Sequence, residues 1–426
     1  MKKDDQSTLK PKLRFPEFRD AKGWDEKSLN EVISPIEREK IKPSLLYTGL
    51  GIRSHGKGTF LKLQANPEKN AMEYLYEVKC DDLILNITFA WEGAVAIAQA
   101  LDDGALVSHR FPTYTFKKGK SIAGFFKFLI LDKKFIYKLG VISPGGAGRN
   151  RVLNKNDFLK LSIVLPNTDE QQKIADCLTS IDKLISAESQ KLDALKTHKK
   201  GLMHQLFPRE GETQPRLRFP EFQDEGDWKG QPFEEFVAKS FYGTSSSTSL
   251  TGQYPVLRMG NMSDGGLDFA NLVYIDLDPD SFESFRLMDG DILLNRTNSP
   301  ALVGKVSLFR LTSECITASY IVTYRLKKQR IDPSFCNFML NTPMYQVRIK
   351  KLAKPSISQA NINPTTFKKE LIVSVPTLPE QQRIAECLTS LDDLITAQSE
   401  KLETLKTHKK GLMQQLFPIV STESAG

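Results

Sequence analysis

The sequence predicts an α+β protein made of two tandem mixed modules, each of which is followed by one long helix. The first observation is an internal repeat, because residues 170–208 return as residues 380–418 with most positions identical. The offset between the copies is constant at 210 residues, far longer than the roughly 20–50-residue period of a solenoid. The second observation is that segments with strand character outnumber helical segments before each copy. Two whole modules, each ending in the same helix, therefore explain the repeat.

Both copies carry one narrow apolar stripe whose members follow alternating steps of four and three residues. This heptad pattern is typical of a helix that pairs with another helix, whereas a helix packed on its own domain usually carries a wider stripe. We therefore expect the two helices to pair, with Glu188 and Lys199 in one stripe and Gln398 and Lys409 in the other fixing the register. The predicted seam consists of Ile174, Leu178, Ile181, Ile185, Leu192, Leu195, Leu202 and Leu206 in the first helix and Ile384, Leu388, Leu391, Ile395, Leu402, Leu405, Leu412 and Leu416 in the second.

Residues at both ends of each repeated helix indicate where it begins and ends. Asn167 and Thr377 are candidate N-caps, and Glu170 and Glu380 follow three residues later, which is the spacing of a capping box. The proline that closes each repeat cannot continue a helix. The predicted helices therefore span residues 167–208 and 377–418.

A second repeated motif marks the beginning of each module. Residues 12–18 read KLRFPEF and residues 216–222 read RLRFPEF, and a tryptophan follows each motif at position 24 or 228. A short polar linker, residues 209–215, separates the first helix from the second motif. The chain is therefore divided into a first module over residues 1–166, a first helix over 167–208, a second module over 209–376, a second helix over 377–418 and a tail over 419–426.

The interiors of the two modules correspond in pattern although their residues differ. Two apolar segments, residues 125–140 and 334–353, are expected to be helices. A last strand, over residues 159–166 or 369–376, returns each module to its long helix. Three pairs of short strands are matched between the modules: residues 80–88 with 289–297, 94–98 with 305–309, and 113–116 with 323–326.

Composition favours a cytoplasmic globular protein with a polyanionic partner. The net charge is +8, and residues 1–168 carry 28 Lys and Arg against 19 Asp and Glu, while residues 209–374 carry 20 against 19. The five cysteines are odd in number and never spaced as CxxC, which argues against a disulfide framework and a zinc site. Because no signal peptide and no apolar run of about 20 residues is present, we expect no membrane partner.

Three stretches resemble catalytic or cofactor motifs but fail at defining positions. Residues 304–306, GKV, lack the first Gly and the final Ser or Thr of a phosphate-binding loop. Residues 363–367, NPTTF, lack the second proline of the amino-methyltransferase motif, and residues 143–150, SPGGAGRN, lack the strand-to-helix context of a dinucleotide fingerprint. The five histidines form no set with metal-ligand spacing. We therefore expect no catalytic residues, no metal site and no cofactor bound by this chain.

Polar loops at matched places in the two modules carry side chains that can read nucleic acids. Arg, Asn and Gln make paired hydrogen bonds to base edges, while Lys, Ser and backbone amides hold phosphates. For any single loop a solvated surface turn is an equally good interpretation, but matched loops in both modules favour DNA contact. The candidate DNA-binding residues are Arg53, Ser54, His55, Lys57, Asn86, Thr88, His109, Arg110, Arg149, Asn150 and Arg151 in the first module and Arg258, Asn261, Asn295, Arg296, Thr297, Asn298, Tyr320, Ser356, Ser358, Gln359 and Asn361 in the second.

The repeated motifs resemble those of a known family. The paired LRFPEF entrances followed by tryptophan, the EQQ-(K/R)-IA-x-CL step into each helix and the KKGLM-x-QLFP ending are similar to the specificity subunit of type I restriction-modification systems. The resemblance covers residues 12–418. It implies two target recognition domains, residues 1–166 and 209–376, with two antiparallel coiled-coil helices as a spacer. Each domain would read one half of a bipartite DNA site, and the subunit itself would not be catalytic.

The same resemblance implies partners and cofactors outside this chain. Such a subunit binds double-stranded DNA and two methyltransferase subunits, which use S-adenosylmethionine to methylate adenine at N6. Two restriction subunits, which use ATP and Mg, can join the complex, and no homo-oligomer is expected. Because the two modules differ, the two half-sites should differ and the target should be asymmetric.

Two alternatives remain open at this point. A stand-alone DNA methyltransferase would need a cofactor loop in this chain. A duplicated scaffold protein without a DNA role would show no sequence-dependent binding in its assembled complex.

Overall fold

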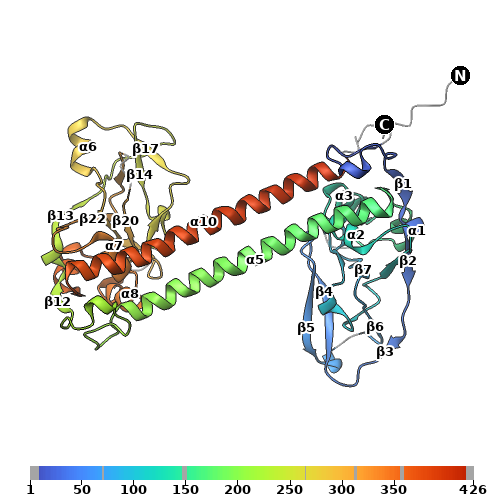
Figure 1. Ribbon diagram of the computed structural model, residues 1–426, viewed down its shortest axis with the longest axis horizontal. Coiled ribbons are helices and arrows are strands. Elements are labelled where there is room, and N and C mark those ends of the chain that lie inside the picture. Colours follow the sequence, from blue (N-terminus) through green and yellow to red (C-terminus); the bar gives the residue numbers. More distant parts are fainter. Residues whose placement is uncertain are drawn as a thin grey trace. The chain divides into compact units, whose positions relative to one another are not determined.

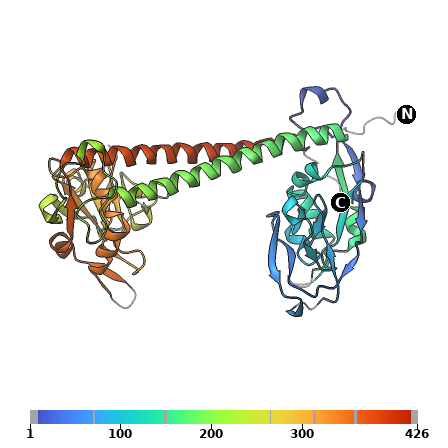
Figure 2. The same ribbon diagram turned by 60° about the horizontal axis from the view of Figure 1, so that its bottom comes forward.

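The chain divides into two structural units, and each unit contains one module together with parts of both long helices. This computed structural model describes residues 9–69, 72–145, 151–263, 265–310, 314–355 and 359–418. Unit 1 comprises residues 1–188 and 401–426, and unit 2 comprises residues 189–400. Figures 1 and 2 show the long helices α5 (Thr168–Leu206) in green and α10 (Leu378–Leu416) in red, and each helix contributes to both units.

Unit 1 is a mixed module in which short strands outnumber helices. Its helices before α5 are α1 (Leu29–Val32), α2 (Ala123–Leu129), α3 (Lys133–Val141) and α4 (Lys155–Lys160). Its described strands are β1 (Asp25–Ser28), β2 (Ile33–Ile36), β3 (Lys40–Ile41), β4 (Tyr47–Ile52), β5 (Thr59–Ala65), β6 (Leu75–Glu77), β7 (Leu83–Leu85), β8 (Val95–Ile97), β9 (Leu106–Val107), β10 (Thr113–Phe116) and β11 (Ser162–Leu165).

Unit 2 has the same mixed character. Its helices before α10 are α6 (Pro279–Phe285), α7 (Pro333–Leu340), α8 (Pro343–Lys351) and α9 (Pro364–Glu370). Its described strands are β12 (Lys229–Pro232), β13 (Val237–Tyr242), β14 (Tyr254–Leu257), β15 (Met262–Ser263), β16 (Gly266–Leu267), β17 (Val273–Ile275), β18 (Ile292–Asn295), β19 (Thr297–Asn298), β20 (Val306–Leu308), β21 (Ile316–Thr317), β22 (Ile321–Leu326), β23 (Ala353–Pro355), β24 (Ala360–Ile362) and β25 (Ile372–Val375).

A four-stranded antiparallel sheet with the same strand order forms the centre of each unit. The order is β2-β10-β7-β8 in unit 1 and β13-β22-β18-β20 in unit 2. The registers also match, because Leu83 lies opposite Tyr114 in one sheet and Ile292 lies opposite Tyr324 in the other. The strand pairs matched from the sequence are therefore confirmed, and so is the α+β class.

A second sheet differs between the units. Unit 1 has five strands in the order β3-β6-β9-β4-β5, whereas the corresponding sheet of unit 2 has three, in the order β17-β14-β21. The sheets correspond because each contains one parallel pair, β4 with β9 and β14 with β21. The two modules therefore share the architecture of the central sheet and differ in the second sheet.

Each apolar segment that the sequence analysis predicts as one helix is in fact two helices. In unit 1 the break comes at Asp132, whose side chain caps α3 by accepting from the N–H of Lys134 at 3.0 Å. In unit 2 it comes at Thr342, which accepts from the N–H of Tyr345 at 3.4 Å, and Pro343 opens α8. The apolar pattern continues through these caps because both helices of each pair pack on the same core.

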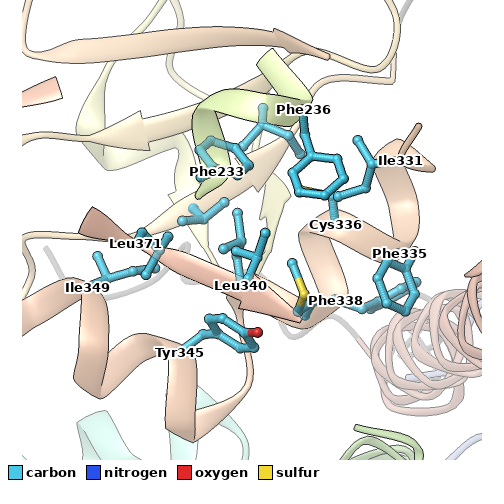
Figure 3. Close-up of a cluster of buried hydrophobic side chains, with 14 of the residues drawn as sticks. Phe233, Phe236, Ile331, Phe335, Cys336, Phe338, Leu340, Tyr345, Ile349 and Leu371 are labelled. Atoms are coloured by element: carbon cyan, nitrogen blue, oxygen red, sulfur yellow. The ribbon is translucent and has the colours of Figure 1, made fainter. Parts of the chain in front are cut away.

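The main core of unit 2 joins the central sheet to the helices around it. Figure 3 shows its buried side chains, including Phe335, Phe338 and Leu340 of α7 and Tyr345 of α8. The same cluster contains Leu206 and Phe207 at the end of α5 and Ile384 and Leu388 of α10. Unit 1 is built in the same way, with Ile174 and Leu178 of α5 and Leu416 of α10 in its main core. Both long helices are thus part of each folded unit.

The repeated entrance motif is fixed to a long helix by a buried ion pair that the sequence analysis misses. Arg14 and Glu170 approach to 2.6 Å in unit 1, and Arg218 and Glu380 approach to 2.7 Å in unit 2. None of these four side chains is more than 7% exposed. Each arginine makes two bonds to its carboxylate and further bonds to backbone carbonyls between the motif and the following tryptophan.

This ion pair corrects the predicted capping of the long helices. Asn167 does cap α5, since its Oδ1 accepts from the N–H of Glu170 at 2.9 Å. At the start of α10 the hydroxyl of Thr377 donates to Glu225 Oε2 at 2.9 Å, and no described backbone N–H is bonded to it. Glu170 and Glu380 accept from arginines and do not complete a capping box.

Within each unit, the two long helices run antiparallel and exchange equivalent contacts. In unit 1, Lys409 Nζ lies 2.5 Å from Asp182 Oδ1 and 5.5 Å from the centre of the Phe128 ring. In unit 2, Lys199 Nζ lies 2.5 Å from Asp392 Oδ1 and 5.1 Å from the Phe338 ring. The two sets are related by the repeat offset of 210 residues. One lysine in each repeat thus joins its helix to the opposite helix and to the module.

The predicted seam is buried or half-buried at all sixteen positions. Leu178 and Leu388 are fully covered, at 0% exposed. Glu188, one of the polar interruptions, is 9% exposed and forms an ion pair with Lys401 at 2.5 Å. None of the described helices combines the length and the apolar character that a membrane span needs.

Candidate nucleic-acid interface

Three polar loops of unit 2 meet at one edge of its central sheet. The N–H of Arg296 donates to Tyr320 O at 3.0 Å, and the N–H of Ile362 donates to Arg296 O at 2.8 Å. Strand β19, directly after Arg296, pairs with β24 so that Thr297 lies opposite Asn361. We call the exposed and half-buried residues of these loops, together with the neighbouring Arg258, the unit 2 edge: Arg258, Arg296, Thr297, Asn298, Tyr320, Gln359 and Asn361.

Arg296 lies at the centre of the unit 2 edge. Its guanidinium carbon is 5.3 Å from the centre of the Tyr242 ring, a cation–π contact that orients the side chain. Among the described residues its Nε has no hydrogen-bond partner. Next to it, Thr297 and Asn361 are joined by a side-chain hydrogen bond of 2.5 Å. The arginine is therefore held by an aromatic ring, and its buried Nε is left without a hydrogen-bond partner among the described residues.

Tyr320 links Arg296 to the loop that carries Arg258. Burial raises the pKa of the Tyr320 hydroxyl, and the positive charge of Arg258 partly opposes this rise. Tyr320 is therefore a neutral hydroxyl, able to donate and to accept, at physiological pH. Arg258 itself donates from Nη2 to Asn271 O at 3.1 Å, which fixes one side of its guanidinium group.

Two of the predicted DNA-binding residues of unit 2 are interior side chains, and this corrects the sequence analysis. Asn261 is 5% exposed, accepts from the N–H of Arg258 and donates to Asp268 O and Ala270 O, so it shapes its own loop. Asn295 is 0% exposed, and its side-chain atoms have no hydrogen-bond partner among the described residues. It points to the face of β18 that the second sheet covers, as does Leu293. Neither side chain can reach a base from this position.

Unit 1 has an edge with the same backbone arrangement. The N–H of Ile87 donates to Arg110 O at 3.1 Å, and the N–H of Leu153 donates to Ile87 O at 2.9 Å. These bonds correspond to those that Arg296 makes with Tyr320 and Ile362. The unit 1 edge consists of the candidate residues around these bonds: Arg53, Ser54, His55, Lys57, Asn86, Thr88, His109, Arg110 and Arg151.

The loop over residues 53–57 packs on the turn that follows Asn86 and Thr88. The N–H of His55 donates to Glu92 O at 2.7 Å, and the hydroxyl of Ser54 donates to Glu92 Oε2 at 2.8 Å. His55 has a φ of 63°, in the left-handed region that few residues adopt. The side chains of Arg53, His55 and Lys57 remain exposed. The loop is therefore fixed by backbone bonds and by the Ser54 side chain, while the side chains of Arg53, His55 and Lys57 face solvent.

Arg151 is held more firmly than the other cations of the unit 1 edge. Its guanidinium carbon is 5.2 Å from the centre of the Trp91 ring, and it donates to Ser143 O and Gly140 O, both at 3.1 Å. His109 and Arg110 are exposed and lie beside the bond between Ile87 and Arg110. Four further candidates, Arg149, Asn150, Ser356 and Ser358, lie outside the described residues.

Sequence reasoning misses the aromatic residues that position the arginines. Phe60 lies under Arg53 at 4.9 Å, Trp91 under Arg151 at 5.2 Å and Tyr242 under Arg296 at 5.3 Å. Phe60 lies seven positions from its arginine, whereas Trp91 and Tyr242 lie 60 and 54 positions from theirs. Only the pairing of β4 with β5 could have been inferred from a local pattern. The distant pairs require knowledge of the sheet order.

Two of the three stretches that resemble catalytic or cofactor motifs have structural roles, and the third, residues 143–150, lies mostly outside the described residues. In NPTTF, Asn363 caps α9 by accepting from the N–H groups of Thr365 and Thr366, and Phe367 stacks on Tyr324 in the core. In GKV, Gly304 has a φ of 85° and Val306 begins β20. Among the described residues, no group of three His, Cys, Asp or Glu side chains could hold a metal ion.

Comparison with protein families and curated proteins gives two consistent results. The family model described as the type I restriction modification DNA specificity domain matches residues 21–197 and again residues 235–407. The putative type I restriction enzyme MjaX specificity subunit of Methanocaldococcus jannaschii is 32% identical over 166 residues, 38% of this chain and 39% of that protein. The MjaVIII specificity subunit of the same organism is 25% identical over 273 residues, 62% of this chain and 63% of that protein. The matches thus span less than two thirds of these relatives.

Solved structures agree on the fold along nearly the whole chain. The S subunit of a type I restriction-modification system from M. genitalium aligns with a TM-score of 0.60 at 14% identity, covering 97% of this chain and 100% of that chain. A chain from a study of complex assembly and conformational transition of the type I restriction-modification system aligns with a TM-score of 0.53 at 16% identity, covering 96% and 99%. At these identities the likeness is one of fold.

Proposed function

Because the chain belongs to the family of the type I restriction modification DNA specificity domain, we propose that it is a specificity subunit that recognises a bipartite, asymmetric DNA target. The observation that carries this proposal is the pair of edges. Their backbone hydrogen bonds are equivalent, from Ile87 to Arg110 and from Arg296 to Tyr320, whereas their side chains differ. Two edges that share a backbone arrangement but carry different side chains are suited to reading two different half-sites.

The side chains of both edges suit contact with duplex DNA. In unit 2, Arg296 and Asn361 belong to the residue types that make paired bonds to guanine and adenine in the major groove. In unit 1, exposed Arg53, Lys57 and Arg110 suit phosphates as well as guanine. This difference agrees with the uneven charge of the two modules, 28 basic against 19 acidic residues over 1–168 and 20 against 19 over 209–374.

We further propose that partner subunits carry out the chemistry, and that this chain is not catalytic. Methylation of adenine at N6 would use S-adenosylmethionine on the methyltransferase partner, and cleavage would use ATP and Mg on the restriction partner. The structural roles of Asn363 and Phe367 support this division, because the stretch that most resembles a methyltransferase motif is a helix cap. This chain would position the partner subunits on DNA and select the DNA sequence on which they act.

Two methyltransferase subunits would dock on two equivalent surfaces of the long helices. Leu184 and Leu394 occupy equivalent positions and are 43% and 53% exposed, which is unusual for leucines on otherwise polar helix faces. Thr-His pairs at residues 197–198 and 407–408 are exposed as well. In unit 2, Lys196, Lys200 and His204 of α5 also line a groove of about 950 Å³ beside α7 and α8. Such repeated surface features support one docking site in each unit.

Native mass spectrometry of the assembled complex tests this stoichiometry. We expect two methyltransferase copies for each chain, and one copy when either Leu184→Glu or Leu394→Glu removes one apolar contact. Ser186→Glu, an exposed position on α5, is a matched control for the added charge. A saturated complex with a single copy would contradict two equivalent docking surfaces.

The proposed function as a whole is tested by sequencing methylated adenines. The chain and its methyltransferase partner are supplied to a host that lacks other restriction-modification systems, and methylation is read by single-molecule sequencing. We expect one motif with two unlike halves separated by a spacer of fixed length. Methylation without a common motif, or no dependence on this chain, would reject the assignment.

A further inference from the structure

A strap of hydroxyl-bearing residues, 244–251, adjoins the unit 2 edge and has no role in the function described above. It reads TSSSTSLT and contains seven Ser and Thr residues. At its start, Thr244 N–H donates to Thr317 O and Ser319 N–H donates to Thr244 O, both at 2.8 Å. Near its end, Ser249 and Tyr274 exchange two backbone hydrogen bonds of 2.9 Å. Residues 245–250 between these anchors are exposed.

The start of the strap is joined directly to the residues around Arg296. Ser319, which bonds to Thr244, precedes Tyr320, whose carbonyl accepts from Arg296 N–H at 3.0 Å. Tyr242, two positions before Thr244, is the ring 5.3 Å from the Arg296 guanidinium carbon. Gly243 between them leaves no room for a side chain, since a Cβ there would lie 1.9 Å from Thr317 O. The strap therefore begins beside the side chain that we assign to base reading.

The charge around the strap suits an anionic partner. Residues 236–263 contain no Asp or Glu, although residues 209–374 carry 19 of them. Module one has an acid-free stretch at the corresponding place, residues 40–67. There the connection from β2 to β4 carries exposed Lys40 and Lys42. In module two, the connection from β13 to β14 is the strap, which has hydroxyls and no cation.

We propose that the strap is a neutral phosphate-contact site, in which hydroxyls of residues 245–247 donate hydrogen bonds to backbone oxygens of DNA bound at the unit 2 edge. This inference rests on the proposed function, because it requires DNA at that edge. Module one would hold the corresponding phosphates with Lys40 and Lys42. Hydroxyls and lysines differ in one measurable respect: only cations release counterions when they contact phosphates.

Salt dependence therefore separates the two kinds of contact. The full chain is assembled with its methyltransferase partner, and its affinity for a duplex with the methylated target is measured between about 50 and 200 mM salt. For Ser245→Ala/Ser246→Ala/Ser247→Ala we expect about tenfold weaker binding at every salt concentration, with an unchanged slope and unchanged base preference. For Lys40→Ala/Lys42→Ala we expect weaker binding and a slope shallower by about 1.8, or 0.9 for each phosphate contact that is lost.

The outcomes distinguish this inference from the proposed function. Unchanged affinity of the triple serine variant, an altered slope or an altered base preference would overturn the neutral phosphate contact. Arg296→Ala, measured in parallel, tests the edge itself. If it loses base preference while the serine variant binds normally, only the strap proposal fails. If neither variant differs from wild type, the unit 2 edge does not face DNA. Equal melting temperatures, expected because residues 245–247 are exposed, exclude misfolding as the cause.

Discussion

Single positions in the two edges show how one backbone arrangement carries different side chains. Ile87 occupies the place of Arg296, and Arg110 occupies the place of Tyr320, yet the backbone bonds at these positions are equivalent. Because the bonds involve main-chain atoms, the side chains can change without altering the architecture. The side chains at these positions can therefore diverge while the fold is retained.

Arg296→Ala should reduce the preference for one base pair in the half-site read by unit 2. The guanidinium group is oriented by Tyr242 at 5.3 Å, and a paired contact with a base contributes about 1–3 kcal/mol of discrimination. Binding of duplexes with single substitutions in each half-site measures the effect. Arg330→Ala is the matched control, since Arg330 is equally cationic but bonds to Glu235 and Gln231. Unchanged affinity and base preference in the Arg296 variant would exclude this loop as the reader.

Arg218→Ala should destabilise unit 2 far more than removal of a nearby exposed arginine. The substitution leaves Glu380, 1% exposed, without its partner, and breaking a buried pair costs about 3–5 kcal/mol. Arg216→Ala removes an ion pair with Glu212 in which the side chains are 53% and 32% exposed, and such pairs contribute about 0–1 kcal/mol. The free energies of unfolding in denaturant give the comparison. Similar values for the two variants would show that the buried pair does not fix the entrance motif.

At the scale of elements, the long helices combine packing with specific polar contacts. Their seam is buried where it meets a module, as at Leu178 and Leu388. The ion pairs of Lys199 with Asp392 and of Lys409 with Asp182 follow the repeat. A shift of one helix along the other would break both pairs, so these contacts define the register as well as adding stability.

Substitution of two leucines of α10 should lower stability to very different extents. Leu388 is 0% exposed and belongs to the core of unit 2, whereas Leu394 is 53% exposed. Leu388→Ala should lower the free energy of unfolding by about 2–5 kcal/mol, because it leaves a cavity. Leu394→Ala should change it by no more than about 0.5 kcal/mol. Denaturant unfolding of the free chain measures both, and an equal loss would mean that the helix faces are misassigned.

The sequence predicted periodic elements well and caps poorly. The long helices and the matched strands can be predicted from residue spacing, because the same pattern occurs once in each module. The pairs α2 with α3 and α7 with α8 were predicted as single helices, because the apolar pattern continues across the caps at Asp132 and Thr342. Glu170 and Glu380 were assigned to capping because an ion pair with a residue about 160 positions away leaves no local signal.

The sequence places the candidate residues in loops, but it does not tell which of their side chains are accessible. Residues 295–298 include one buried position and three half-buried positions. Because all four residues are polar, polar character alone cannot tell the buried residue from the accessible ones. Asn295 and Asn261 are interior, while Arg296 and Asn298 are at least partly accessible. The strand period decides which side each residue faces, and the end of β18 was not identifiable from the sequence.

At the scale of the whole chain, both units make the same contacts between an entrance motif and the end of a long helix. Only in unit 2 do these two segments follow each other directly in the sequence. In unit 2 the end of α5 runs on into the second entrance motif, and Leu217 N–H donates to Gln205 O at 3.0 Å. In unit 1 the first entrance motif meets the end of α10 instead, and Leu13 N–H donates to Gln415 O at 3.0 Å. Trp24 packs on Phe417 as Trp228 packs on Phe207. The end of α10 thus packs on the first module through the same contacts that the end of α5 makes with the second module.

A chain that ends after Pro208 should therefore form a homodimer. Ile174 and Leu178 stay buried in the core of unit 1. Without a partner, the rest of the seam would be exposed, at roughly 1.5–3 kcal/mol of lost burial for each side chain. A second copy supplies the missing contacts, because Lys199 stands where Lys409 bonds to Asp182, and Lys191 stands where Lys401 bonds to Glu188. Phe207 of the second copy would likewise take the place of Phe417 beside Trp24.

Such a dimer has two-fold symmetry, so its identical modules would meet DNA as inverted copies. We predict that residues 1–208, assembled with the methyltransferase partner, methylate an inverted repeat of the half-site read by module one. Sedimentation or light scattering measures the oligomeric state, and sequencing of methylated adenines gives the target. Asp182→Lys in the fragment should weaken the dimer because it places two lysines together, and Lys199→Asp in the same chain should restore it. A monomeric fragment, or continued methylation of the asymmetric target, would show that the helices do not pair in this way.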